Sequence, residues 1–226
     1  MIEKAKGGSI VSSYIMHICI SNIVKNKYNL SSKYMYGSVL PDLKKNMGCD
    51  RTSTHFTEKV ETKGGIRDLP QIDKAILELK DKMNFEVYLG YISHLIEDYI
   101  WFNKYIPEYT KKLNENEVLY LKNNSIHSLD EYRNDVYSDY RYFAKYIVDK
   151  CEMNLTQTLK DISHYLNEEE TKILIQNTSI NTEAPSSAIL ISTESIDKYI
   201  QECVSEVDKI VNNMLNNKDK IECISC

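Results

Sequence analysis

The stretch FEVYLGYISHLIEDYIWFNKY, residues 85–105, decides the fold. Its apolar residues lie on nearly every side of a helix rather than along one stripe, which is typical of a helix buried at the centre of a domain. Asn84 is suited to cap the start of this helix, and Pro107 to end it. We therefore predict a bundle of helices packed around a central helix over 85–105.

The segments on both sides of this stretch favour further helices. Only 7 Gly and 4 Pro occur in the chain, fewer than a β-sandwich or a doubly wound α/β domain normally needs. Residues 42–65 lack helical spacing and are predicted to form a long loop, and no Asn-Gly turn indicates a β-hairpin. Ser9 and Asp68 are suited to cap the first two of the remaining helices. The spacing of apolar residues predicts these helices over 10–24, 72–79, 115–122, 128–151, 155–166 and 193–217.

The composition excludes several classes of protein. Hydrophobic residues make up 42% of the 226 residues, and 28 basic against 33 acidic side chains give a net charge of −5. A disordered chain would have fewer apolar residues, and a protein that grips nucleic acid through its phosphates would be basic. No stretch reaches the roughly 18 apolar residues of a membrane span. We expect a helical domain over 1–176, a linker loop over 177–192, and a C-terminal helix and tail over 193–226 that packs on the same domain or forms a homodimer.

The six cysteines provide no complete zinc or redox motif. Cys223 and Cys226 form a C-x-x-C pair that lacks both the second pair of a zinc knuckle and the strand and helix of a redox site, so we interpret it as an incidental tail. Residues 10–24 contain too many polar side chains for a signal peptide, and we expect a cytoplasmic protein. The other four cysteines look like single buried thiols: Cys19, Cys49, Cys151 and Cys203.

The strongest local indication of function is the pair His94 and Asp98 on the predicted central helix. Residues four apart differ by about 40° in direction, so the two side chains project from the same face. A buried imidazole beside a buried carboxylate is costly unless the two are paired or bound to a metal. A simple hydrogen bond within the helix is an equally good interpretation of this pair alone. Glu97 points about 100° away from Asp98 and is expected to face solvent.

Three further candidates lie in other segments. His17 is on the first predicted helix, Asp42 follows Pro41 in a predicted tight turn, and His55 is in the predicted loop. Taken singly, they would be a core histidine, a turn aspartate and a surface histidine. Together with His94 and Asp98 they supply the mixture of imidazole and carboxylate ligands that suits zinc or a site with two metals.

The order of these residues resembles that of the zinc-dependent phospholipase C superfamily, which is related to the single-strand-specific zinc nucleases of fungi and plants. The resemblance rests on His17, on GSVLPD at 37–42, on His55-Phe56 and on GYISHLIED at 90–98, and it covers about residues 10–145. The chain is most similar to the short bacterial members. The resemblance implies an all-α multi-helix fold whose helical domain, residues 1–176, holds metal ions at the bottom of a cleft.

The resemblance also implies a set of ligands. Asp42, His55, His94 and Asp98 would hold one zinc ion, and Asp98 would bridge to a second ion that also binds His17. In the exported members the mature N-terminal amine completes the second site, whereas here residues 1–16 precede His17 without a visible cleavage site. We expect between one and three Zn²⁺ ions, with two favoured.

A third metal site is only partly matched. The exported members have a histidine soon after the His-x-x-x-Asp motif, and none occurs here. Their later His-x-x-x-Glu pair has a counterpart in His127 and Glu131, which we nevertheless expect to be surface residues. Asp139, on the predicted helix over 128–151, is an alternative acidic contributor to the cleft or a solvated helix position.

The expected function is the hydrolysis of phosphoester bonds by metal-activated water, with Asp42 and Asp98 as catalytic residues. Asp98 would bridge the metals, and Asp42, or Glu97 if it turned inward, would orient the water as a general base. A small phosphoester or a phospholipid headgroup is expected ahead of nucleic acid as the substrate. Two alternatives are an HD-type phosphohydrolase, which requires an adjacent His-Asp pair that is missing here, and a non-enzymatic helical binding protein that retains the fold.

Overall fold

The computed structural model describes residues 14–180 and 185–222, and the side chains up to residue 217. The predicted cap Ser9 and the Cys223–Cys226 pair lie outside the described residues. The helical fold is confirmed, with two small antiparallel sheets added to it. The helices are α1 Tyr14–Tyr28, α2 Ser32–Asn46, α3 Arg51–His55, α4 Ile72–Leu79, α5 Phe85–Ile100, α6 Leu129–Lys150, α7 Leu155–Ser163, α8 Glu168–Thr178 and α9 Thr193–Glu222. The strands are β1 Thr57–Thr62, β2 Gly65–Pro70, β3 Thr110–Lys112, β4 Glu117–Tyr120 and β5 Ser125–Ser128.

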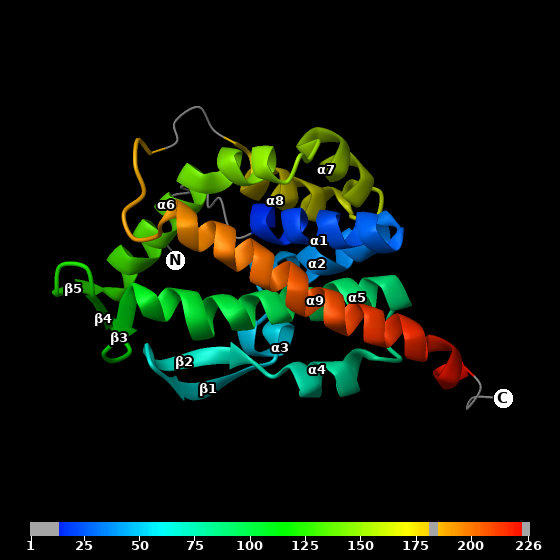
Figure 1. The fold of residues 1–226 in the computed structure, drawn as a ribbon, viewed down its shortest axis with the longest axis horizontal. Helices are drawn as coiled ribbons and strands as arrows, with labels where there is room; N and C mark the ends of the chain where they lie inside the picture. Colours follow the sequence, from blue (N-terminus) through cyan, green and yellow to red (C-terminus); the bar gives the residue numbers. More distant parts are fainter. Residues whose placement is uncertain (1–13, 181–184, 223–226) are drawn as a thin grey trace, which may run out of the picture.

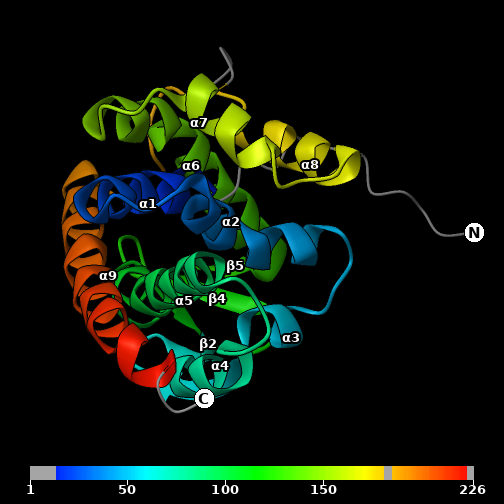
Figure 2. The same cartoon turned by 90° about the vertical axis from the view of Figure 1, so that its right-hand side faces the viewer.

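Helix α5 is the centre of the molecule, as its composition predicted (Figure 1). Nearly all its residues are buried, and Asn84 caps its start by accepting a hydrogen bond from the backbone N–H of Glu86. Helices α2, α4 and α9 and strand β2 all pack against it. Figure 2 shows α1 and α2 between α5 on one side and α7 and α8 on the other, with α9 along the edge of this stack.

Two glycines let α2 and α5 approach each other closely. A Cβ atom at Gly90 of α5 would collide with the carbonyl oxygen of Tyr34 on α2, and one at Gly37 would collide with the carbonyl oxygen of Val87. Both obstacles are backbone atoms, which cannot rotate away as the end of a side chain can. The small residues therefore set the distance between the two helices, and that distance fixes where Asp42 lies relative to His94.

The long loop predicted over 42–65 is wrong. Helix α2 continues through Pro41 to Asn46, since its buried face packs on α5, and α3 begins only five residues later. Strands β1 and β2 then form a hairpin in which Thr62 pairs with Gly65, leaving a two-residue turn. Gly65 has a φ of +86°, a conformation that glycine adopts readily, so the Gly64-Gly65 pair was the overlooked turn signal.

Other boundaries also differ from the sequence predictions. Residues 115–122 were predicted as a helix, but they contain β4, in which the alternate residues Val118 and Tyr120 are buried. Asp68 lies in β2 and does not cap α4. The central helix changes after Ile100 to a π-helical turn, Trp101–Tyr105. Helix α8 was not predicted, although Asn167 and Glu170 form a capping box at its start.

The structure joins two of the cysteines that were predicted to be single thiols. Cys19 of α1 and Cys151 at the C-terminal end of α6 form a disulfide, with their Cα atoms 6.0 Å apart. Cys49 is exposed rather than buried, whereas Cys203 is a buried free thiol as predicted. The cytoplasmic location stays a prediction.

We expect reduction of this disulfide to destabilise the protein. The bond closes a loop with a sequence separation of 132 residues, and restricting so long a loop in the unfolded chain is worth roughly 4–5 kcal/mol in the chain-entropy model. Urea titration should show a lower free energy of unfolding with reductant for wild type, but no effect of reductant on Cys151→Ser. The exposed Cys49→Ser is the control and should respond as wild type does. A wild type that is equally stable with and without reductant would contradict the bond.

Candidate metal centre

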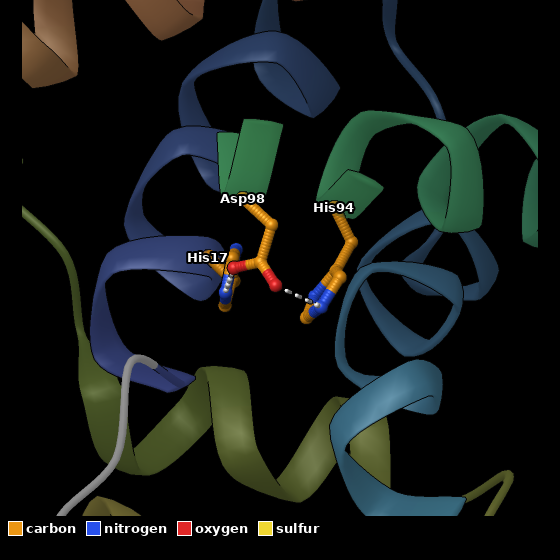
Figure 3. Close-up of side chains that lie close together, drawn as sticks. All are labelled: His17, His94 and Asp98. Carbon is orange, nitrogen blue, oxygen red and sulfur yellow. Dashed lines mark ion pairs between the residues drawn. The ribbon is translucent and has the colours of Figure 1, made fainter. Parts of the chain in front are cut away.

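Four helices bring the five predicted ligands together in the interior. His17 comes from α1, Asp42 from α2, His55 from the end of α3, and His94 and Asp98 from α5. All five are at most 5% exposed. Asp42 therefore belongs to a helix and not to a turn, and His55 lies in the interior and not at the surface. Figure 3 shows His17 and His94 on either side of the Asp98 carboxylate.

The nitrogen and oxygen atoms of the cluster converge within a few ångströms. His55 Nε2 lies 3.2 Å from His94 Nε2, 3.4 Å from Asp42 Oδ1 and 3.7 Å from Asp98 Oδ2. Asp98 also lies 4.0 Å from His94 Nε2 and 3.6 Å from His17 Nε2. Two sets of three potential metal ligands result, His17 with His94 and Asp98, and Asp42 with His55 and His94.

Each histidine is oriented by a hydrogen bond at the nitrogen that faces away from the cluster. Nδ1 of His94 donates to the carbonyl oxygen of Ser38, at 2.8 Å. A hydrogen bond of 2.8 Å joins Nδ1 of His55 to Thr54 Oγ1, and Nδ1 of His17 donates to Glu97 Oε2, at 2.6 Å. With a proton on Nδ1, each Nε2 lone pair would be directed at a metal bound in the cluster, which is the usual arrangement around metal-ligating histidines.

The arrangement of acceptors in the cluster suits a cation. The Nε2 atoms of His55 and His94 face each other at 3.2 Å, and carboxylate oxygens of Asp42 and Asp98 lie within 4.0 Å of them. His17 Nε2 is buried and has no hydrogen-bond partner. Converging lone pairs in a buried site are unfavourable unless a positive charge lies among them. Imidazole and carboxylate ligands are the ones that zinc binds, so the residues present fit the metal.

Glu97 is part of the site, contrary to the prediction that it faces solvent. It is completely buried, and its hydrogen bond to His17 forms the carboxylate–histidine pair that commonly supports a metal ligand. Burial raises the pKa of Glu97 to about 7, while the hydrogen bond from His17 acts in the opposite direction. The helical spacing could not reveal its burial because α1 and α9 pack against the part of α5 that would otherwise face solvent.

Burial and neighbouring charges determine the protonation of the other groups. Burial lowers the pKa of His94 to about 4 and also lowers that of His55, so both rings favour the neutral form that binds metals. Burial alone would raise the pKa of Asp42 and Asp98. The charge of Lys45 and the contact with His55 beside Asp42, and the charge of Arg51 beside Asp98, outweigh burial and hold both carboxyl pKa values below their usual range.

The two predicted catalytic aspartates line a cavity of about 190 Å³. Two cationic side chains lie beside them, with Arg51 Nη2 2.8 Å from Asp98 Oδ2 and Lys45 Nζ 3.6 Å from Asp42 Oδ1. Tyr140 also lines the cavity, and its hydroxyl accepts a hydrogen bond from Trp101 Nε1, at 2.7 Å. The cluster is therefore open to a small molecule on the side where its carboxylates and cations meet.

A comparison with protein families decides the affiliation of the chain. The model described as zinc dependent phospholipase C matches residues 14–213. The chain belongs to the zinc-dependent phospholipase C family. This confirms the predicted resemblance and extends it beyond residue 145. Comparison with curated proteins and with solved structures gives no match.

One candidate functional residue of this zinc-dependent phospholipase C family protein, Arg51, was not identified from the sequence. Arg51 is the first residue of α3 and is held between Asp98 and the ring of Phe102, whose centroid is 5.3 Å from its guanidinium carbon. Asp50 caps α3 by accepting from the backbone of Ser53, and this Asp-x-x-Ser pattern was the available signal for a helix start. Nothing in the local pattern indicated that the helix would present Arg51 to the cluster.

The candidates for an additional site lie elsewhere in the zinc-dependent phospholipase C fold. His127 lies on β5, where it stacks on Tyr120, and Glu131 forms a capping box with Ser128 at the start of α6. Asp139 is fully buried, so it is not a solvated helix position. Its carboxylate accepts three backbone hydrogen bonds, from residues 189–191, and thereby anchors the segment that leads into α9. None of the three belongs to the ligand sets found among the described residues.

Among the described helices, none combines the length and the apolar character that crossing a membrane requires.

Proposed function

We propose that the protein hydrolyses phosphoester bonds with the help of two zinc ions. The observation that supports this most is the convergence of two aspartates and three histidine Nε2 atoms at the edge of a cavity, with each imidazole held by a hydrogen bond at its Nδ1. Membership of the zinc-dependent phospholipase C family implies phosphoester substrates. Zinc, when bound, supplies a water of lowered pKa and neutralises the charge of the phosphoryl oxygens.

The two ligand sets suggest how the ions would be held. His17, His94 and Asp98 would bind one ion, and Asp42 and His55 would bind the other, together with His94 or Asp98. Asp98 is suited to bridge because its oxygens lie within 4.0 Å of all three histidines. Glu97 keeps His17 in the required tautomer and orientation.

The remaining residues of the cavity would act on the substrate. Asp42, which is negatively charged and lines the cavity, would accept a proton from the attacking water as general base. Arg51 and Lys45 would bind phosphoryl oxygens, for which guanidinium and ammonium groups are well suited. The Tyr140 hydroxyl accepts from Trp101 and therefore keeps its own proton for donation to a phosphate oxygen. Tyr91, by contrast, donates its proton to the carbonyl oxygen of Thr54.

Metal analysis tests the proposal most directly. Protein purified without chelators, or reconstituted with zinc and desalted, is expected to hold about two equivalents, as a two-metal site requires. His94→Ala should lose most of this zinc because His94 belongs to both ligand sets. His164→Ala, which removes an exposed histidine, is the matched control and should retain it. A wild-type protein that takes up no zinc would overturn the hydrolase and favour a helical binding protein that keeps the fold.

A further inference from the structure

A second cavity adjoins the one beside the metal centre. It has a volume of about 160 Å³, and Arg51, Phe102, Tyr132 and Arg133 line both cavities. The two cavities are therefore adjacent, and together they are called the double groove here. One end of it contains Asp42 and Asp98, and the other end is lined by Arg67 of β2 and Lys112 of β3. A ligand that spans both cavities would reach from the metal centre past Arg51 towards Arg67.

The far end of the double groove contains a buried cation without an acidic partner. Arg67 is only 8% exposed, and its Nη2 donates to the carbonyl oxygen and the hydroxyl of Thr110, both at 3.2 Å. Its Nε–H has no hydrogen-bond partner, and the ion pairs of the described residues include none to Arg67. Burying a charged guanidinium beside neutral groups is costly, and an anionic ligand offsets that cost.

The neighbouring charges point to the same kind of ligand. Among the described residues, Lys112 and Arg133 form ion pairs with the exposed carboxylates of Glu115 and Asp130, at 3.4 Å and 3.1 Å, and pairs of that kind contribute little. Asp68 is the one acidic side chain that lines this cavity, against four cationic ones. This surplus of positive charge occurs in a chain whose net charge is −5, so it is local to the groove.

We propose that Arg67, Lys112 and Arg133 form a subsite for a second phosphate group of the substrate. The inference rests on the proposed function, in which the scissile phosphoester lies at the metal centre. The substrates would then be phosphoesters that carry another phosphate, either small soluble molecules such as nucleoside bisphosphate esters or lipids with a phosphorylated headgroup. A quaternary ammonium group at this position would meet like charges, so a choline headgroup is disfavoured.

Matched substrates test the subsite. The soluble pair is thymidine 5′-(p-nitrophenyl phosphate) with and without a 3′-phosphate, and the lipid pair is phosphatidylinositol 4-phosphate and phosphatidylinositol in mixed micelles. For zinc-loaded wild type we expect kcat/KM to be about tenfold higher for the member with the added phosphate, as one or two charge-assisted hydrogen bonds would give. If the soluble pair shows this preference, the substrate is a small soluble phosphoester; if the lipid pair shows it, the substrate is a lipid with a phosphorylated headgroup.

Two variants distinguish a subsite from general electrostatics. Arg133→Gln removes an exposed guanidinium from the groove and should abolish most of the preference, largely through KM. Arg67→Met removes the buried one and should do the same. Lys145→Gln removes one positive charge from the same helix, at a residue that pairs with Asp149 outside the groove, and should leave the preference unchanged. A preference that Lys145→Gln reduces as much as Arg133→Gln does would overturn the subsite.

The two proposals can fail separately. If wild type hydrolyses these compounds without a preference for the added phosphate, the subsite is wrong and the hydrolase stands. If wild type hydrolyses none of them, the proposed function is in doubt, and binding of inorganic pyrophosphate, followed by calorimetry, decides the subsite. Pyrophosphate should then bind wild type and Lys145→Gln equally and bind both Arg133→Gln and Arg67→Met at least about tenfold more weakly. Equal binding to all four proteins would overturn it.

Discussion

Asp98→Asn is expected to abolish zinc binding and to lower the rate of phosphoester hydrolysis by about 1,000-fold or more. The carboxylate lies within 4.0 Å of the Nε2 atoms of His17, His55 and His94, so it is in contact with both ligand sets. Asparagine keeps the shape but lacks the charge, and its amide group would direct hydrogens towards Arg51 or the histidines. Losing about 4 kcal/mol of transition-state stabilisation corresponds to that change in rate.

The measurement combines zinc content, hydrolysis of bis(p-nitrophenyl) phosphate and circular dichroism. The spectrum of Asp98→Asn should match that of wild type, since the side-chain volume is retained. Asp149→Asn is the matched control because its carboxylate is 64% exposed and, within the part of the chain that the structure describes, pairs with Lys145 alone. If Asp98→Asn binds as much zinc as wild type and remains active, the metal centre is not where we place it.

Gly90→Ala should destabilise the protein by about 3 kcal/mol, as forced overpacking in a tight interior does. In most helices the same substitution would stabilise by about 1 kcal/mol, because alanine restricts the unfolded chain. Here the new methyl group would meet the carbonyl oxygen of Tyr34 and the backbone of Ser38 and Gly37, so α2 and α5 would have to separate. The expected change in the free energy of unfolding therefore has the opposite sign from the change that helix propensity alone predicts.

Urea titration of metal-free protein measures this change, and zinc content measures its effect on the site. Zinc should bind more weakly to Gly90→Ala because the carbonyl oxygen of Ser38, on α2, orients His94 on α5. Tyr99→Ala, at a position on α5 that is 39% exposed, should change stability much less. A Gly90→Ala protein at least as stable as wild type would show that the two helices are not held at this distance.

The central helix and its two ligands could be predicted from the sequence alone. The apolar residues of 85–100 surround the helix, Asn84 caps it, and the four-residue spacing places His94 and Asp98 on one face. All of these depend on residues within a few turns of one another, so the local pattern contains the necessary information. The family resemblance added His17, Asp42 and His55 through their order along the chain.

The local pattern failed where polar residues form regular structure. Strand β1 has the sequence Thr-Glu-Lys-Val-Glu-Thr and is mostly exposed, so it has no apolar alternation to reveal it. The continuation of α2 past Pro41 was not predicted either, because a proline inside a helix is unfavourable. The contact between α2 and α5 outweighs that cost, and it depends on a distant segment. The double groove depends on these segments, because β2 supplies Arg67 and α3 supplies Arg51.

The sequence by itself therefore determined a helical protein, its buried central helix and the identity of five potential zinc ligands. Only the tertiary structure decided that Glu97 supports His17, that Arg51 lies beside Asp98 and that Arg67 is buried without a counter-ion among the described residues. The physical reason is that helical periodicity is a local property, whereas the burial of a charged side chain depends on which distant segments pack over it. Glu97 and His17 are 80 residues apart in the chain, and no periodicity of either helix encodes their contact.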